Sequence, residues 1–466
     1  MSIDWVAFGV DLHLELDPAS GRRAGLERAL REAIRAGRLA PYTRLPSTRS
    51  LALELDLARG TVSAAYDQLI AEGYLSARTG SGTVVADLAE CRAHAVQPTT
   101  EVSAPRYDLR PGSPDVSTFP TAAWLRATRR ALAVAPVAAY DYGDPRGRVE
   151  LRTALADYLG RARGVRAIPD QIVITSGYVQ ALALLAGVLD GAVLAMEDPG
   201  LSFHRDVVRH ARAGVVALPV DERGARTDLL STSGFTAARA VVVTPAHQYP
   251  TGVTLHPHRR HAATEWARSG DGLIIEDDYD GEFRYDRQPV GALQGMAPDH
   301  VAYVGTAAKT LGPALRLAWM VLPERLVEPV IHAKRHTDLH TEVIGQLALA
   351  DLIASHAYDR HIRACRLRYR HRRDLLVSRL GRRFALHGIA AGLHAMVSLP
   401  ATGPGEQQIL ARAAARGLAL GDLGRHWHTP GDHPPGLIIG YSTPNEGSYP
   451  AALETLARVL HSGPSG

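Results

Sequence analysis

Only two side chains of the 466-residue sequence carry a primary amine, because all but two of its 52 basic residues are arginine. Lys309 lies at the end of a β-branched run in the glycine- and alanine-rich segment VGTAAKTLGPALRLAW, where loss of solvent would lower the pKa of the amine and make it nucleophilic. Lys334 lies in VIHAKRHTD, which predicts an exposed helix. We therefore predict that Lys309 is the catalytic amine and forms an imine with a carbonyl group.

A carboxylate and a phenol follow the apolar run of LIIEDDYDGEFRYD. Asp277 and Tyr279 are two residues apart, so their side chains lie on the same side of an extended backbone. Asp277 can then keep a ring nitrogen protonated while Tyr279 donates to a phenolic oxygen. The alternative is a magnesium site with Asp277, Asp278 and Asp280 as its oxygen ligands, which would leave the amine and the phenol without a role.

Two further segments suit a phosphate group. Residues 176–179 follow the run QIVIT and open a helix, and free N–H groups at a helix N-terminus bind anions. Thr306 and Arg316 flank the lysine in sequence and can complete the cradle. An amine, an acid, a phenolic donor and a phosphate cradle are what pyridoxal 5'-phosphate requires of a protein. The predicted cofactor site contains Lys309, Asp277, Tyr279, Arg316, Thr306, Ser176, Gly177, Tyr178 and Val179.

The elements that must position these residues form an α/β body over residues 108–466. Strand-like runs alternate with helical stretches, which predicts a mostly parallel sheet, and ligands of such sheets bind beyond the carboxyl ends of the strands. From about residue 350 an arginine-rich helix opens a smaller α+β subdomain. Its arginines are expected in solvent and not on nucleic acid, with Ile362, Cys365, Leu367 and Tyr369 packed inward.

Residues 20–86 form a separate basic segment, with ten basic and six acidic residues between positions 20 and 85. Its periodicity predicts three short helices, the second capped by Ser47, and then two β runs joined at Gly80–Ser81–Gly82. This order describes a winged helix-turn-helix. Residues 87–107 are rich in proline, serine and threonine and are the expected linker. The predicted core residues are Leu26, Leu30, Ala33, Ile34, Val62, Ala65, Tyr66 and Leu69.

The polar groups of this segment suit double-stranded DNA. Arginine binds guanine edges or phosphates, helix N-termini hold phosphates, and a glycine-rich wing lets the backbone approach the minor groove. The alternative is that Ser47 is only a helix cap and Arg49 only a surface charge. The predicted DNA contacts are Arg44, Ser47, Thr48, Arg49, Arg59, Thr61, Ser63 and Gly82.

The segment GRLAPYTRLPSTRSLALELDLARGTVSAAYDQLIAEGYL resembles the GntR-type winged helix-turn-helix, and RPGSPDVSTFP, TPAHQYPTG and GTAAKTLGPALRLAWMVLP resemble fold-type I aminotransferases. The whole chain is similar to the MocR-type subfamily of GntR transcriptional regulators. The resemblance implies that Lys309 forms the imine with pyridoxal phosphate, with Asp277 at the pyridine nitrogen, Tyr279 at the phenolic oxygen and Arg316 at the phosphate. It also implies a homodimer, in which Tyr142 contributes to the site of the partner subunit.

Some positions depart from the family's pattern. Leu201, with Phe203 two residues later, stands where a tyrosine commonly stacks on the cofactor ring, and Ala308 stands where a serine commonly precedes the lysine. The segment PPGLIIGYSTPNEG has no arginine to hold a substrate carboxylate, and the nearest one is Arg425. Tyr42 replaces a frequent glycine in the turn before the second helix.

We therefore expect a cytoplasmic regulator that binds promoter DNA through residues 20–86. Residues 108–466 would sense pyridoxal phosphate, or an amine or amino acid that condenses with it. The alternative is a working aminotransferase with an accessory DNA-binding head, which the missing arginine makes less favourable. Two cysteines are too few for a disulfide framework, no apolar run is long enough to span a membrane, and no metal site is predicted.

Overall fold

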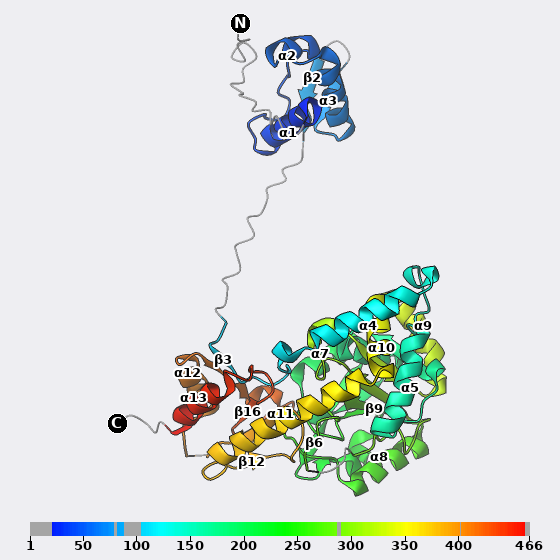
Figure 1. The fold of residues 1–466 in the computed structure, drawn as a ribbon, viewed down its shortest axis with the longest axis vertical. Helices are drawn as coiled ribbons and strands as arrows, with labels where there is room; N and C mark the ends of the chain where they lie inside the picture. Colours follow the sequence, from blue (N-terminus) through cyan, green and yellow to red (C-terminus); the bar gives the residue numbers. More distant parts are fainter. Residues whose placement is uncertain (1–20, 79–81, 88–103, 287–289, 401, 462–466) are drawn as a thin grey trace. The chain divides into compact units, whose positions relative to one another are not determined.

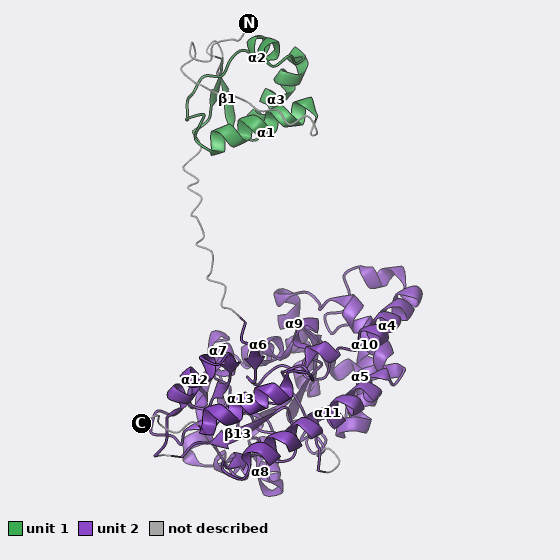
Figure 2. Ribbon diagram, turned by 60° about the vertical axis from the view of Figure 1, so that its left-hand side comes forward, with its two compact units in different colours: residues 1–102 green, residues 103–466 purple. Residues whose placement is uncertain are grey.

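A computed structural model describes residues 21–78, 82–87, 104–286, 290–400 and 402–461 of the chain (Figure 1). The chain divides into two compact units, residues 1–102 and 103–466, which are coloured separately in Figure 2. Residues 88–103, most of the expected linker, lie outside the described residues. Within the described part of the chain, no helix has the length and apolar character that crossing a membrane requires.

The N-terminal unit is the predicted winged helix-turn-helix. Every predicted core residue is buried in one cluster, which confirms the helical spacing read from the sequence. The strands pair antiparallel with Leu75 opposite Val85, and Arg44 bridges to Val84 beside them. The wing tip, residues 79–81, lies outside the described residues. The elements are α1 (Arg22–Arg35), α2 (Thr48–Glu54), α3 (Arg59–Ala71), β1 (Leu75–Arg78) and β2 (Gly82–Val85).

An eight-stranded sheet forms the centre of the second unit, in the order β4-β11-β10-β9-β8-β5-β6-β7. Strands β10, β9, β8, β5 and β6 run parallel, and β11 is antiparallel to both of its neighbours, which confirms a mostly parallel sheet. The bounds are β4 (Ile172–Thr175), β5 (Val193–Asp198), β6 (Gly214–Asp221), β7 (Gly224–Ala225), β8 (Ala238–Val243), β9 (Leu273–Asp278), β10 (Val301–Thr306) and β11 (Ala318–Val321).

Helices cover both faces of this sheet because side chains alternate along its strands. In β9, Leu273 and Ile275 pack with α6, α7 and α9, whereas Ile274 packs against α8 on the opposite face. Helices α5 and α10 pack in a third cluster with β4 and β11. The bounds are α4 (Thr121–Val134), α5 (Val149–Arg163), α6 (Tyr178–Val188), α7 (Ser202–His210), α8 (Pro257–Gly270), α9 (Glu324–Thr337) and α10 (Val343–Ala354).

The smaller subdomain has its own antiparallel sheet, in the order β12-β13-β16-β15. The long helix α11 runs from the large sheet toward this smaller one (Figure 1). Strand β3, near the start of the unit, pairs with β14, so both ends of the body meet in this subdomain. The bounds are β3 (Tyr107–Asp108), α11 (Ala357–Leu380), β12 (Leu386–His387), β13 (His394–Ser398), α12 (Glu406–Ala414), β14 (Leu418–Ala419), β15 (Gly421–Asp422), β16 (Gly436–Gly440) and α13 (Tyr449–His461).

The prediction that Leu367 of α11 packs inward was wrong. Ile362, Cys365 and Tyr369 are buried, but Leu367 is 65% exposed. The buried positions repeat every three or four residues, and Leu367 is five residues beyond Ile362, which turns it well away from that face. Leu367 therefore shares the outer side of the helix with exposed arginines such as Arg360. The expectation that the arginines of this helix lie in solvent was wrong at Arg372, which is buried on the inner face and pairs with Asp115 at 2.7 Å.

Candidate cofactor site and nucleic-acid interface

Lys309 lines a cavity of about 440 Å³ at the edge where the parallel strands end. This volume falls within the ~300–1,000 Å³ range of small-molecule sites. Lys309 follows β10 by three residues, and its Nζ donates to the backbone carbonyl of Gly112. Burial lowers the pKa of its amine, while Asp277 and Asp280 oppose that shift. A lowered pKa increases the neutral, nucleophilic fraction of the amine.

The prediction of an exposed Lys334 was wrong, because its side chain is fully buried. Its Nζ donates to both carboxylate oxygens of Asp338 at 2.8 Å and to Thr341 at 3.0 Å. An amphipathic pattern does not show whether a lysine finds a buried carboxylate. The paired amine is not at the cavity, so Lys309 is the one lysine positioned there.

Strand alternation separates the neighbouring carboxylates of β9. Asp277 points into the cavity, whereas Asp278 points to the opposite face and forms a paired contact with Arg163 at 2.6 and 2.9 Å. Asp280 lies 2.9 Å from Nδ1 of His247. The alternative of a magnesium site formed by the three carboxylates is therefore not supported, because Asp278 and Asp280 are engaged by Arg163 and His247 and only Asp277 faces the cavity.

The carboxylate of Asp277 has an unsatisfied oxygen. Its Oδ1 is buried and has no hydrogen-bond partner among the described residues. Burial raises the pKa of Asp277 well above its usual value, Asp278 and Glu197 add to the shift, and Lys309 opposes it. A buried acceptor without a partner is costly, so the site suits a ligand that brings an N–H group or a positive charge to this oxygen.

Tyr279 lines the same cavity, as its spacing from Asp277 predicts. Its hydroxyl donates to the backbone carbonyl of His247 at 3.0 Å. Burial raises the pKa of Tyr279 well above its usual value, and Asp280 and Asp277 raise it further. The phenol therefore keeps its single proton, and it can serve a ligand oxygen only by turning away from that carbonyl.

The predicted phosphate cradle comes together around Gly177, which precedes α6 and has a φ of +112°. A Cβ at this position would stand 2.5 Å from Nη2 of Arg316, so only glycine leaves room for the guanidinium. Thr306, the last residue of β10, donates to the carbonyl of Leu317 and accepts from the N–H of Ala308. The helix N-terminus and the guanidinium thus meet at one corner of the cavity.

Most of the predicted cofactor residues line this single cavity, and two do not. Ser176 is absent from its lining, and its backbone N–H donates to the side chain of Gln180 at 2.7 Å. Tyr142 is 82% exposed and does not line the cavity of its own chain. The cavity does contain Lys309, Asp277, Tyr279, Arg316, Thr306, Gly177, Tyr178 and Val179.

Other lining residues had not been singled out. His204 lies one helical turn beyond Leu201, and its ring is 4.6 Å from that of Tyr178. Burial and the charge of Lys309 lower the pKa of His204 to about 3, so its imidazole is neutral. The i, i+3 spacing from Leu201 was a usable signal. His394 comes from β13 of the smaller subdomain, and no local pattern points to it.

Arg425, the arginine nearest in sequence to the segment that lacks one for a substrate carboxylate, does not line the cavity. The side chain of Arg425 is 64% exposed and pairs with Asp422 at 2.5 Å. A buried arginine, Arg205, does line the cavity, but it donates to the backbone carbonyls of Gly200 and His426. These contacts occupy Arg205 in holding the adjacent loops.

The predicted DNA contacts of the N-terminal unit lie outside its core, and none of them is fully buried. Ser47 caps α2 by accepting from the N–H of Ser50 at 3.1 Å. Arg44 packs against Gly82, where a Cβ would lie 3.3 Å from its Nε. The side chains of Arg49 and Arg59 are exposed at the starts of α2 and α3, where the described residues supply no ion pair. Thr48, which begins α2, and Thr61 and Ser63, near the start of α3, are half-buried.

The cavity fits pyridoxal phosphate in its chemistry. The unpartnered Asp277 oxygen suits a protonated pyridine nitrogen, Lys309 offers an amine, and the glycine-bounded corner with Arg316 suits a phosphate. Ala308 contributes no hydroxyl to this corner.

Comparison with protein families divides the chain as the structure does. Residues 108–417 match the family described as aminotransferase class I and II. Residues 23–85 match the bacterial regulatory proteins of the gntR family.

Similar proteins extend over nearly the whole chain. The HTH-type pyridoxine biosynthesis transcriptional regulator PdxR of Corynebacterium glutamicum is 32% identical, over 97% of this chain and 99% of its own length. The probable rhizopine catabolism regulatory protein MocR of Rhizobium meliloti is 33% identical, over 90% and 89%. Among solved structures, the kynurenine aminotransferase of Pyrococcus horikoshii, in complex with PMP, has a TM-score of 0.69 and 26% identity over 77% of this chain and 91% of that one.

Proposed function

The chain belongs to the MocR-type transcriptional regulators, which join a gntR-family module to an aminotransferase class I and II body. We propose that it controls transcription in response to pyridoxal 5'-phosphate or to an amine that condenses with it. One observation carries the sensing part of the proposal. A buried, unpartnered carboxylate oxygen of Asp277 faces the cavity that also contains the amine of Lys309 and the guanidinium of Arg316.

Each of these residues has a separate task. Pyridoxal phosphate supplies an aldehyde that reacts reversibly with a primary amine. Burial keeps part of the Lys309 amine neutral and able to attack. Asp277 holds a proton at the ring nitrogen, and Tyr279 donates to the phenolic oxygen. The N–H groups that open α6 bind the phosphate together with Arg316.

The smaller subdomain takes part in the same cavity. Leu393 and His394 line it from that subdomain, and Pro111 and Gly112 line it from the segment that follows β3. A ligand that binds more tightly to one arrangement of the two subdomains shifts the population toward that arrangement. This shift would be transmitted to the DNA-binding unit. The coupling free energy cannot exceed the difference between the ligand's binding free energies for the two arrangements.

A transaminase role is less well supported. Such an enzyme must orient a substrate carboxylate as well as form the imine. Arg425 is exposed and paired with Asp422, and Arg205 is engaged with backbone carbonyls. The relatives that match nearly the whole chain also carry the names of regulators.

The attachment of the cofactor is tested by borohydride reduction of the full chain with pyridoxal phosphate, followed by peptide mass mapping. Because the chain has only two lysines, the experiment contains its own control. We expect the added mass on the Lys309 peptide and none on the Lys334 peptide, whose amine is held by Asp338. Lys309→Ala should abolish the mass increase. An unmodified Lys309 peptide would refute the sensing proposal.

Regulation is tested by footprinting of the chain on its own upstream DNA with and without pyridoxal phosphate. We expect protection of a defined site that changes in extent or affinity with the cofactor, and no such change with Lys309→Ala. Identical footprints under both conditions would exclude the cofactor response but leave DNA binding intact.

We also propose a homodimer in which Tyr142 reaches the partner's cavity. Its high exposure and its absence from its own cavity support this proposal. Tyr142→Ala should weaken cofactor binding only in the dimer, which sedimentation and titration at several chain concentrations would separate. Unchanged affinity at all concentrations would contradict it.

A further inference from the structure

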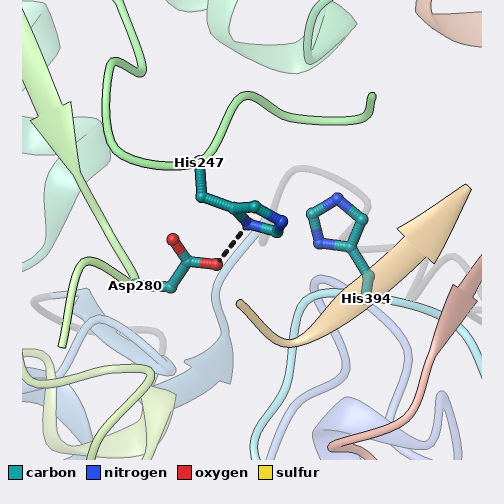
Figure 3. A group of neighbouring side chains, drawn as sticks. All are labelled: His247, Asp280 and His394. Carbon is teal, nitrogen blue, oxygen red and sulfur yellow. Dashed lines mark hydrogen bonds and ion pairs between the residues drawn. The ribbon is translucent and has the colours of Figure 1, made fainter. Parts of the chain in front are cut away.

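Three buried side chains lie together where the two subdomains of the body meet (Figure 3). His247 follows β8, Asp280 follows β9, and His394 begins β13 of the smaller subdomain. One nitrogen or oxygen from each residue lies within 4.8 Å of the corresponding atoms of the other two. Neither histidine has a part in the predicted cofactor set.

A carboxylate determines which nitrogen of His247 carries the proton. Nδ1 of His247 is 2.9 Å from Oδ2 of Asp280, and an ionised carboxylate only accepts hydrogen bonds. Nδ1 is therefore the donor, and Nε2 is left with a lone pair. This Nε2 is buried and has no hydrogen-bond partner among the described residues.

A carbonyl determines the tautomer of His394 in the same way. Its Nε2 donates to the backbone carbonyl of Pro250 at 3.2 Å, so the lone pair belongs to Nδ1. The two ring centroids are 4.8 Å apart, and Figure 3 shows a nitrogen of each ring turned toward the other. The unpartnered Nε2 of His247 thus lies beside the second imidazole, and a cation between the two rings would bind a lone pair from each.

We propose that His247 and His394 bind a zinc-class divalent cation through Nε2 and Nδ1, with Asp280 as the carboxylate that orients His247. Neutral imidazole is a preferred ligand of zinc and its first-row neighbours. Metal-bound histidines almost always donate their other N–H to a carboxylate or a backbone carbonyl, and here Asp280 and Pro250 accept those two N–H groups. The negative charge of Asp280 also offsets part of the charge of the ion.

Two protein ligands leave coordination positions open. His394 lines the cavity that contains Lys309, so the ion is reached from that cavity and presents its open positions there. The ion would also join the smaller subdomain to the loop after β8. This site does not depend on the proposed cofactor, and the two are tested separately.

The test is a titration of the full, chelator-treated chain with Zn²⁺ by calorimetry and with Co²⁺ by visible absorption. We expect one equivalent of either ion per chain and a Co²⁺ spectrum typical of nitrogen ligation. His247→Gln and His394→Gln should each abolish this binding. Asp280→Asn should weaken it by about 10- to 100-fold, as expected for loss of an orienting carboxylate.

The matched control is the exposed pair His332 and His336 on α9, whose rings are 4.6 Å apart. The double replacement of this pair by glutamine should leave the Zn²⁺ affinity unchanged. The proposal is overturned if this control loses the ion, or if His247→Gln and His394→Gln retain it. It is also overturned if the unaltered chain gives no stoichiometric Co²⁺ spectrum, a measurement that requires no variant to fold.

Discussion

Gly177→Ala is the substitution that tests the phosphate corner most directly. Gly177 precedes α6 at a φ of +112°, and an added Cβ would lie 2.5 Å from Nη2 and 2.9 Å from Cζ of Arg316. The guanidinium cannot stay in place against such a contact. Alanine is also strained at this φ, at a cost of about 1–3 kcal/mol. The substitution therefore moves the arginine without altering its charge.

The loss can be estimated from the interaction removed. A hydrogen bond to a charged group contributes about 1.5–3 kcal/mol. Since each 1.4 kcal/mol is a factor of ten in affinity, Gly177→Ala should weaken binding of pyridoxal phosphate by about 10- to 150-fold. Binding of pyridoxal, which has no phosphate, should change much less. The affinity of the cofactor-free chain for DNA should not change.

The assay is an absorption titration of the cofactor-free variant with pyridoxal phosphate and, in parallel, with pyridoxal. Gly187→Ala is the matched control, because Gly187 lies in the same helix with nothing within 4 Å of its added Cβ. If Gly177→Ala binds pyridoxal phosphate as tightly as Gly187→Ala does, the phosphate does not bind at this corner. An equal loss for both ligands would show a general distortion of the cavity instead.

Three further outcomes are expected. Burial raises the pKa of Glu197 from 4.5 to about 7, so between these values the folded chain holds a proton that the unfolded chain has released. The free energy of unfolding should therefore fall as pH rises through this window. Glu197→Gln should make that fall shallower in urea titrations, and Glu276 and Glu282, whose pKa values burial also raises to about 7, should account for what remains. Tyr66→Phe leaves the buried carbonyl of Pro46 without the hydroxyl that donates to it at 3.0 Å, and should destabilise the N-terminal unit by about 1–3 kcal/mol. Thermal unfolding should then show this unit melting at a lower temperature. An unchanged melting temperature would contradict the packing of this unit. Arg49→Ala should weaken DNA binding and reduce its salt dependence by about one phosphate contact, whereas Arg360→Ala, an exposed charge on α11, should do neither.

Much of the architecture follows from local spacing. The apolar positions of α1 and α3 lie on one face of each helix and are buried as expected. The two-residue spacing of Asp277, in β9, and Tyr279, just after it, predicted that both side chains face one side, and both line the cavity. The prediction failed at Leu367, which lies two residues beyond the buried Cys365 and therefore on another side of α11.

The sequence by itself determined the two-part organisation, the mostly parallel sheet and the position of Lys309 just beyond a strand, because these depend on residue type and on the order of elements along the chain. Only the tertiary structure showed that Lys334 is buried against Asp338, that Asp278 turns to Arg163, and that His394 meets His247. Contacts of that kind join elements distant in sequence. They depend on how the layers pack, and the periodicity of a single helix or strand contains no information about its neighbours across the core.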